Sequence, residues 1–182
     1  MKDIRIRAVR PYEDVDELLA IYAPYVTETA VSFEYIPPTR EEFLQRILNT
    51  VKSYPYLVAE VDGRIAGYVY ISKFHERPAY DWSVETSIYI DMKLRKSGIG
   101  TKLYEEVEKI LKERNYKNMY ACIAYPNPAS IAFHEKMGYK TIGHFTNCAY
   151  KLDKWYDMVW MEKFIGEHKD IPDKIVRANM IE

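Results

Sequence analysis

The sequence predicts an α+β or α/β protein built on one mixed sheet. Segments with alternating apolar and polar residues are separated by segments in which apolar residues recur every three to four positions. Their order is β-α-α-β-β-β-α-β-α-β-β, and strands and helices interleaved in this way pack as a sheet covered by helices. A length of 182 residues fits one domain with a single sizeable core better than two domains.

The chain begins with a strand. Ile4, Ile6 and Ala8 alternate with Arg5 and Arg7, which predicts a strand with one face in water.

Two helices follow, separated by an irregular segment. Pro11 suits the first turn of a helix, and the acidic residues that come after it are favoured there by the helix dipole. Residues 27–39 include Pro37 and Pro38, which rule out a helix in that segment. Thr39 and Glu42 have the spacing of a capping box, so the second helix is expected to begin there.

The middle of the chain predicts three strands and a helix. Two β-rich runs within residues 56–74 flank Asp62-Gly63, a strong hairpin signal, and residues 82–90 form a third run. The helix that begins beyond Gly98 has one apolar face and is expected to end near Asn115.

The last part of the chain predicts three more strands and a short helix. Residues 118–125 read as a strand, residues 129–137 as a helix that ends at Gly138, and residues 139–151 and 154–164 as two further strands. We therefore expect one domain over residues 1–165 and a polar tail over residues 166–182, which is either disordered or a packing arm.

The composition and net charge limit the classes of partner that the protein is expected to bind. The net charge is −1, so any site for an anion must be local, and we expect neither nucleic acid nor a membrane as partner. No apolar run approaches the roughly 20 residues that span a bilayer, and the N-terminus lacks a signal peptide's apolar core, so a cytoplasmic location is expected. Cys122 and Cys148 are expected to be small buried residues. The 17 tyrosines are expected mainly to pack, although a polar pocket could use several.

The stretch R-K-S-G-I-G-T, residues 95–101, joins the third of the middle strands to the helix beyond it. A helix N-terminus presents unpaired N–H groups and about half a positive charge. Gly98 and Gly100 lack Cβ atoms and Arg95 and Lys96 add charge, so a pyrophosphate could bind there. A turn that needs glycine only for its dihedral angles is the alternative. No P-loop or dinucleotide fingerprint is present.

This R-x-x-G-x-G loop resembles the acyl-CoA loop of the GNAT N-acetyltransferase superfamily, and N-P-A-S-I-A-F-H-E-K-M-G-Y, residues 127–139, resembles its second cofactor segment. Within the superfamily, residues 32–34, 54–63, 77–85 and 125–135 resemble phosphinothricin N-acetyltransferases. The resemblance runs from the first strand to about Phe164. It implies the GNAT fold, with a mostly antiparallel sheet of about six to seven strands, acetyl-CoA as co-substrate, no metal, and pairing as a homodimer.

The resemblance also assigns site residues. Catalytic roles would fall to Glu85 and His134. The acceptor would be bound by Phe33, Arg77, Tyr80 and Trp82. Acetyl-CoA would be bound by Ser87, Ile88, Tyr89, Ile90, Arg95, Lys96, Ser97, Gly98, Ile99, Gly100, Thr101 and Asn127.

The chemistry of these residue types is consistent with such roles, and each has an alternative. Glu85 interrupts a strand, where it could take a proton from an amine or only form a salt bridge. His134 titrates near neutral pH and could protonate the departing thiolate, or it could be structural. Asn127 could contact the pantetheine arm or cap a helix. The backbone of residues 87–90 could pair with pantetheine amides, and one of its N–H groups could polarise the thioester carbonyl.

The acceptor residues also have structural alternatives. Arg77 offers a forked partner for a carboxylate or phosphinate, or is a solvated charge, and the three aromatic residues could belong to the core. Residues 151–157 depart from the K-H-G-x-W-x-D run of the family, which leaves the acceptor open. The sequence therefore predicts an acetyltransferase acting on the primary amine of a small amino-acid-like substrate of the phosphinothricin, methionine sulfoximine or methionine sulfone type. The alternatives are a polyamine, aminoglycoside or peptide acceptor, or a non-catalytic acyl-CoA sensor.

Overall fold

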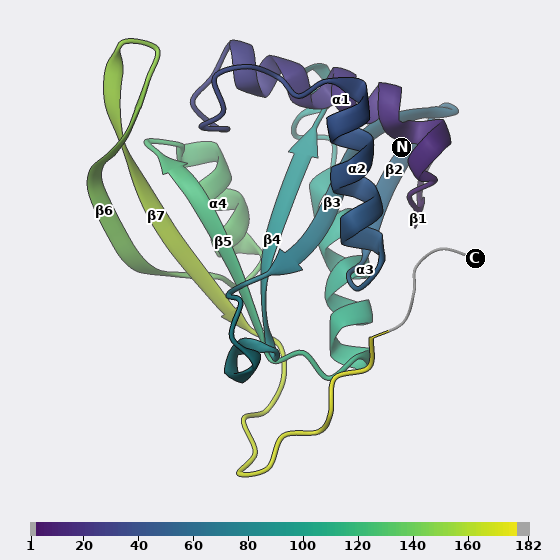
Figure 1. The fold of residues 1–182 in the computed structure, drawn as a ribbon, viewed down its shortest axis with the longest axis vertical. Helices are drawn as coiled ribbons and strands as arrows, with labels where there is room; N and C mark the ends of the chain where they lie inside the picture. Colours follow the sequence, from purple (N-terminus) through teal and green to yellow (C-terminus); the bar gives the residue numbers. More distant parts are fainter. Residues whose placement is uncertain (1–2, 178–182) are drawn as a thin grey trace.

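The computed structural model describes residues 3–177, in which seven strands form one sheet in the order β1-β2-β3-β4-β5-β7-β6 (Figure 1). The strands are β1 Ile4–Ala8, β2 Tyr56–Val61, β3 Arg64–Lys73, β4 Ser83–Ile90, β5 Asn118–Tyr125, β6 Lys140–Lys151 and β7 Lys154–Phe164. The helices are α1 Pro11–Thr27, α2 Arg40–Val51, α3 Ile99–Glu113 and α4 Pro128–Lys136, and η1 Pro78–Tyr80 and η2 Met92–Leu94 are short 3₁₀ turns. Only β4 and β5 pair in parallel, so the predicted fold class and strand number are confirmed.

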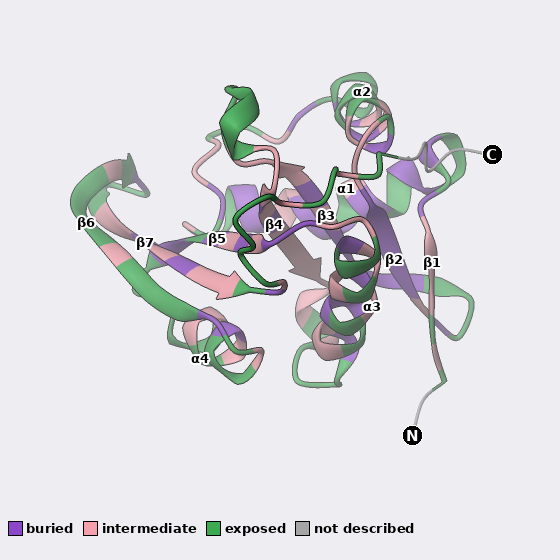
Figure 2. Ribbon diagram, turned by 90° about the horizontal axis from the view of Figure 1, so that it is seen from below, coloured by how far each residue is buried: buried purple, intermediate pink, exposed green. Residues whose placement is uncertain are grey.

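The two faces of the sheet carry separate apolar cores. On one face, the apolar stripe of α3 packs on β2 to β5 and β7, with α4 beside it. On the other face, α1 and α2 pack on β2, β3 and β4, where tyrosines of the strands take much of the contact. Figure 2 shows buried residues concentrated in β2 and β3 and exposed ones along β6. Figure 1 shows α2 over the β2 and β3 side of the sheet, with β7 and β6 at the side away from it.

Local signals in the sequence locate most element boundaries. Asp62 and Gly63 both have positive φ, 53° and 77°, as a two-residue hairpin turn with matching twist requires. The Thr39 side chain and the Glu42 side chain satisfy each other's backbone N–H groups, so the predicted capping box is confirmed. Helix α1 continues to Thr27, with Pro24 inside it, beyond the apolar stripe that predicts it.

Two expectations about burial are wrong. Arg7 does not face water: it forms ion pairs of 2.7 Å with Asp14 and with Glu60, because the N-terminus of α1 lies over this strand position and supplies a buried carboxylate. Cys122 and Cys148 are both exposed, because the face of β5 and β6 on which they lie has no helix over it.

Strands β4 and β5 separate after a short seam. Their parallel register covers only Ser83 with Asn118, Val84 with Met119, and Glu85 with Tyr120. Beyond this seam β4 stays paired with β3 as far as Ile90, whereas β5 continues in register with β7. The sheet therefore opens between residues 86–90 and 121–125, and the β5-facing backbone edge of β4 is left unpaired there.

The chain after β7 packs as an arm up to the end of the described residues. The indole Nε1 of Trp82 donates to the Asp173 carbonyl at 2.8 Å, and Asn115 donates to the Lys174 carbonyl at 2.8 Å. Arg177 pairs with Asp81 at 2.9 Å. Residues 173, 174 and 177 thus contact the domain, whereas residues 178–182 of the expected tail lie outside the described residues. Within the described residues, no helix is long and apolar enough to cross a membrane.

Candidate active site

Glu85 lies in the central strand β4, at the last position before β4 and β5 separate. Its neighbours Val84 and Thr86 are buried, Val84 in the α3 core, so alternation places Glu85 on the opposite face. Within residues 3–177 no side chain forms an ion pair with Glu85, and burial raises the pKa of its carboxyl above the ordinary value. The salt-bridge alternative is therefore not observed. A half-buried carboxylate with a raised pKa, beside an opening in the sheet, has the properties of a general base.

The opening between β4 and β5 holds a small cavity of about 60 Å³. Five predicted site residues line it: Ser87, Ile88, Tyr89, Asn127 and His134. It is bounded by β4, β5 and the first turns of α4, so one wall is the unpaired edge of β4. A narrow slot with open peptide groups on one wall suits an elongated ligand that itself carries amides.

The loop of residues 95–98 is exposed and leads into α3, whose first residue is Ile99. Gly98 has φ +85°, and a Cβ there would meet nothing within 4 Å, so this position requires glycine for its conformation. Gly100 has a different reason: a Cβ there would lie 3.2 Å from the ring of Phe133 in α4. Gly98 thus has a turn requirement and Gly100 a packing requirement, and the close approach of a ligand to either glycine stays a prediction.

The N-terminus of α3 nevertheless retains the properties of an anion site. Its first N–H groups have no partner within the helix, and the exposed side chains of Arg95 and Lys96 come directly before it. The Arg95 guanidinium carbon lies 5.2 Å from the centre of the Tyr25 ring, and the Tyr25 hydroxyl donates to the Ile90 carbonyl at 2.6 Å. Helix α1 thereby holds both the end of β4 and the basic loop. The basic N-terminus and the slot beside it fit the pyrophosphate and the pantetheine arm of acetyl-CoA.

Asn127 and His134 line the slot, and both side chains form hydrogen bonds within the protein. The Asn127 side chain caps α4 by accepting from the Ser130 N–H at 3.2 Å, so the capping alternative is observed together with its place in the slot. His134 Nδ1 lies 2.8 Å from the Ser130 carbonyl, and Nε2 lies 2.7 Å from the Tyr104 hydroxyl. A carbonyl only accepts, so Nδ1 carries the proton and Nε2 accepts from Tyr104.

The His134 ring is therefore neutral with both nitrogens occupied. It is only 3% exposed, and burial lowers its pKa below the ordinary value. Since Nε2 already receives the Tyr104 proton and Nδ1 is held by a carbonyl, this ring is less available as a proton donor than its sequence position suggests.

A stability measurement tests this arrangement. His134→Leu is expected to lower the free energy of unfolding at pH 7.5 by about 1–3 kcal/mol, because the buried Tyr104 hydroxyl loses its acceptor. Because the folded pKa of His134 is depressed, the unfolded chain binds a proton between that pKa and about 6.5 that the folded chain does not bind. Wild-type stability therefore falls as the pH drops below about 6.5, and His134→Leu removes this component.

Urea unfolding at pH 7.5 and pH 5.5 measures both effects. The same substitution at exposed His75 is the control and keeps the pH-dependent component. If His134→Leu retained the whole wild-type difference between the two pH values, the buried neutral histidine would not be its source.

The acceptor residues lie around Glu85 at different distances from its strand. Phe33 is half-buried in the loop between α1 and α2, with its ring 6.4 Å from that of Tyr156 in β7. The same loop is tied to the β6–β7 hairpin, because buried Lys151 donates to the Ser32 carbonyl at 2.5 Å. The loop and the hairpin together close one end of the open half of the sheet.

An aromatic cluster lies beside Glu85 on the other side. Phe74 stacks on Tyr120 at 4.2 Å, and Tyr80 meets Phe74 at 5.9 Å. Tyr120 is the register partner of Glu85, so Tyr80 is brought near the base through this cluster. Arg77 is exposed just before η1, whereas the polar group of Trp82 points to the C-terminal arm. The structure thus gives Trp82 an anchoring contact.

The sequence interpretation missed several residues that line the slot, namely Val31, Thr86, Cys122 and Ser130. Cys122 lies across the slot from β4 and is exposed. The alternation of residues along β5 could have predicted this position. Asn118, Tyr120 and Cys122 alternate with buried Met119, Ala121 and Ile123, so they lie on the opposite face.

Comparison with known proteins agrees with this geometry. A family model described as an acetyltransferase (GNAT) domain matches residues 6–160. A phosphinothricin N-acetyltransferase of Streptomyces viridochromogenes is 32% identical over 152 residues, 83% of each chain. A solved GNAT phosphinothricin acetyltransferase of Sinorhizobium meliloti in complex with AcCoA has a TM-score of 0.89, 30% identity and 93% coverage of each chain. A ribosomal-protein-alanine N-acetyltransferase of Brucella melitensis has a TM-score of 0.84 and 30% identity, covering 88% of this chain and 99% of its own.

Proposed function

Since the chain belongs to the GNAT acetyltransferase family and is an acetyl-CoA-dependent N-acetyltransferase, we propose that its acceptor is the primary amine of a small amino acid of the phosphinothricin, methionine sulfoximine or methionine sulfone type. The observation that supports this most strongly is the unpaired carboxylate of Glu85 at the point where β4 and β5 separate. A relative that acts on an amino acid analogue supports the acceptor class.

Glu85 is the general base in this proposal. An ammonium group has no lone pair, so the acceptor must lose a proton before it attacks the thioester. Burial raises the pKa of Glu85 above its ordinary value, which makes the carboxylate a better proton acceptor. The proton passes from the amine to Glu85, directly or through one water.

The slot positions the thioester for this attack. The basic N-terminus of α3 holds the phosphates, and the open edge of β4 pairs with the pantetheine amides. A peptide N–H of residues 87–90 polarises the thioester carbonyl as negative charge develops on its oxygen. Because both nitrogens of His134 are occupied, a water molecule is the proton donor that the geometry favours for the departing thiolate.

The acceptor is held at its acidic end by Arg77. This side chain is exposed just before η1, and η1 contributes Tyr80 to the aromatic cluster next to Glu85. A guanidinium binds a carboxylate through two parallel hydrogen bonds, which fixes its orientation. Phe33 and Tyr80 close the two ends of the open face, and a cationic polyamine would lack a partner for Arg77.

A thiol-release assay over an amine panel tests the proposal. Methionine sulfone and phosphinothricin are expected to be acetylated, with weaker turnover of a polyamine, an aminoglycoside and a peptide with N-terminal alanine. The peptide is included because one similar structure is a ribosomal-protein-alanine N-acetyltransferase. Preference for the peptide or the polyamine would overturn the acceptor class, and tight acetyl-CoA binding without turnover of any amine would indicate a sensor.

Homodimer formation is also part of the proposal. The outer strand β6, the β6–β7 turn and the start of β7 expose apolar side chains: Ile142, Phe145, Leu152 and Trp155. Such a patch on an edge strand favours pairing with another chain. Light scattering is expected to give twice the chain mass of 21.5 kDa, and Phe145→Glu is expected to return the monomer mass. A monomeric wild type would contradict this part.

Two further parts of the proposal concern the cell. Acetylation removes the positive charge of the amine, so a toxic amino acid analogue would lose the group by which its targets recognise it, and detoxification is the proposed use. The proposed location is the cytoplasm, which cell fractionation would test.

A further inference from the structure

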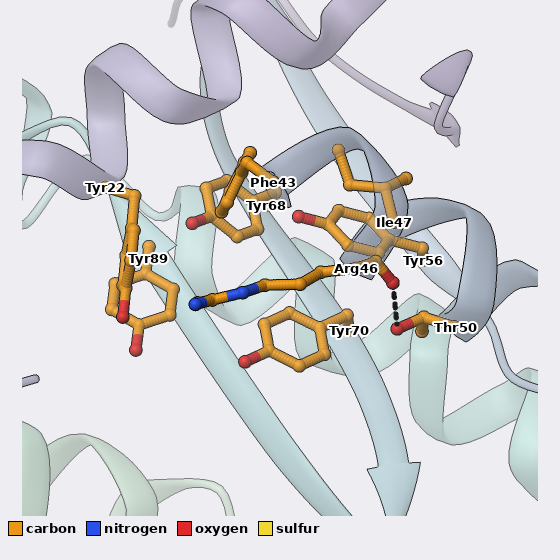
Figure 3. A pocket seen from close by; sticks show the side chains of 9 residues that line it. All are labelled: Tyr22, Phe43, Arg46, Ile47, Thr50, Tyr56, Tyr68, Tyr70 and Tyr89. Atoms are coloured by element: carbon orange, nitrogen blue, oxygen red, sulfur yellow. Dashed lines mark hydrogen bonds between the residues drawn. The ribbon is translucent and has the colours of Figure 1, made fainter. Parts of the chain in front are cut away.

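A second cavity lies under α2, on the same face of the sheet as Glu85 (Figure 3). Its volume is about 220 Å³, and its walls come from α1, α2 and strands β2, β3 and β4. The residues that line it are Tyr22, Phe43, Arg46, Ile47, Thr50, Tyr56, Tyr68, Tyr70 and Tyr89. Six of these nine side chains are aromatic, so the cavity is a ring-lined pocket, which we call the tyrosine pocket. Five of the 17 tyrosines of the sequence line it.

The charges at the tyrosine pocket cancel. The Arg46 side chain lies along the pocket over the Tyr70 ring, with its guanidinium toward Tyr22 and Tyr89 (Figure 3). It pairs with Glu34 at 2.7 Å, and Tyr22 donates to the same carboxylate at 2.8 Å. Since one cation and one anion meet at the rim, a ligand group with either net charge would lie close to a like charge. The tyrosine pocket therefore favours a neutral group.

The tyrosine pocket adjoins the position of the acceptor amine. Tyr70 in β3 is the register partner of Ser87, and Ser87 is two residues from Glu85 on the same face of β4, about 7 Å along the strand. Burial raises the pKa of Tyr70, and the negative charge of Glu85 adds to this rise. Tyr89 lines both the tyrosine pocket and the slot between β4 and β5. An amine at Glu85 would thus have its substituent directed across Tyr70 into the tyrosine pocket.

We propose that the tyrosine pocket receives the side chain of the acceptor and selects a neutral aromatic ring. This inference rests on the proposed function, because it takes Glu85 as the base that meets the amine. An apolar cavity of about 150 Å³ is large enough for benzene, so about 220 Å³ accommodates a phenyl ring. Offset and edge-to-face contacts with the surrounding rings add to the gain from burying it. The acceptor class therefore extends from methionine sulfone to aromatic amino acids.

Steady-state kinetics with acetyl-CoA test the inference on the full chain. The acceptors are L-phenylalanine, L-alanine, L-glutamate and L-ornithine, with methionine sulfone as the reference acceptor. Burial of a phenyl side chain predicts kcat/KM for phenylalanine roughly 10- to 100-fold above that for alanine, and glutamate and ornithine are expected to fall below phenylalanine. Phenylalanine at or below the level of alanine would overturn the inference, and continued turnover of methionine sulfone would leave the proposed function standing.

A filled pocket provides the second test. Thr50 is half-buried near the end of α2 and lines the tyrosine pocket, so Thr50→Trp is expected to remove the preference for phenylalanine over alanine. Asn49→Trp adds the same ring one residue away on the exposed side of α2 and is expected to retain the preference. Equal preference in all three proteins would contradict the assignment of the ring to this pocket.

A binding measurement distinguishes failure of the proposed function from failure of the pocket assignment. Calorimetry with 3-phenylpropionate, which has the ring and the acid but no amine, is expected to show binding to wild type and Asn49→Trp and at least a tenfold loss in Thr50→Trp. If no amino acid were acetylated, the proposed function would fail, and this comparison would still decide the pocket. Absence of binding to wild type, or equal binding to Thr50→Trp, would overturn the inference.

Discussion

Glu85→Gln is expected to lower kcat/KM for methionine sulfone by a factor of about 10²–10⁴, the usual contribution of general base catalysis. Glutamine has nearly the same shape but cannot accept the amine proton. No ion pair depends on Glu85 within the described residues, so the substitution is not expected to lower stability. Acetyl-CoA affinity is also expected to be unchanged, which places the loss in the chemical step.

The pH dependence distinguishes a base from a binding residue. Glu85 works in its ionised form, so wild-type kcat/KM is expected to fall with acid on a limb set by the pKa of Glu85, above the ordinary value for glutamate. Glu85→Gln loses that limb and is flat where wild type falls. Glu113→Gln, which changes an exposed carboxylate at the C-terminal end of α3, retains it. A Glu85→Gln enzyme with wild-type kcat/KM and the wild-type acidic limb would show that the proton goes elsewhere.

The second large effect is expected from reversing the charge before α3. Arg95→Glu with Lys96→Glu places two carboxylates where the phosphates of acetyl-CoA are proposed to bind. Hydrogen bonds to charged groups contribute about 1.5–3 kcal/mol each, so the KM and Kd of acetyl-CoA are expected to rise at least 100-fold. Both side chains are exposed, so the fold is expected to be retained. Calorimetric titration with acetyl-CoA gives Kd directly.

The control for this variant lies two residues upstream of Arg95. Lys93 is exposed in η2 and carries the same charge outside the loop, so Lys93→Glu is expected to change Kd by less than about threefold. Equal effects of the two variants would indicate long-range attraction rather than a phosphate site. An unchanged Kd in the double variant would remove the loop from the binding site. Gly100→Glu is a poorer test, since a side chain there meets Phe133.

Local chemistry accounts for how much of the fold could be predicted. The Asp62-Gly63 turn and the Thr39 capping box depend on residues close together in the chain, so their signals survive without tertiary information. The position of Arg7 could not be predicted, because its partners Asp14 and Glu60 are brought to it by α1 and β2. Exposure of Cys122 depends equally on a distant fact, the lack of a helix over the face of β5 on which it lies.

The candidate site also combines residues that could be predicted from the sequence with contacts that could not. Of the residues that the sequence assigns to acetyl-CoA, Ser87, Ile88, Tyr89 and Asn127 line one slot in the structure. The partner of His134 could not be predicted, because Tyr104 comes from a different helix. Likewise, the two glycines of the loop look alike in the sequence but are required for different reasons. Gly98 has a positive φ, and a side chain at Gly100 would meet the ring of Phe133. Only tertiary contacts distinguish these causes.

The short seam between β4 and β5 has a consequence for stability. Three register pairs join an antiparallel ribbon of β1 to β4 to a second ribbon of β5 to β7. A ligand that spans the gap contacts both ribbons and binds the folded chain more tightly than the unfolded chain. Its binding therefore stabilises the fold. At a hundred times its Kd, such a ligand adds about 2.7 kcal/mol to the free energy of unfolding. The melting temperature of this enzyme is therefore expected to rise with the concentration of acetyl-CoA around it.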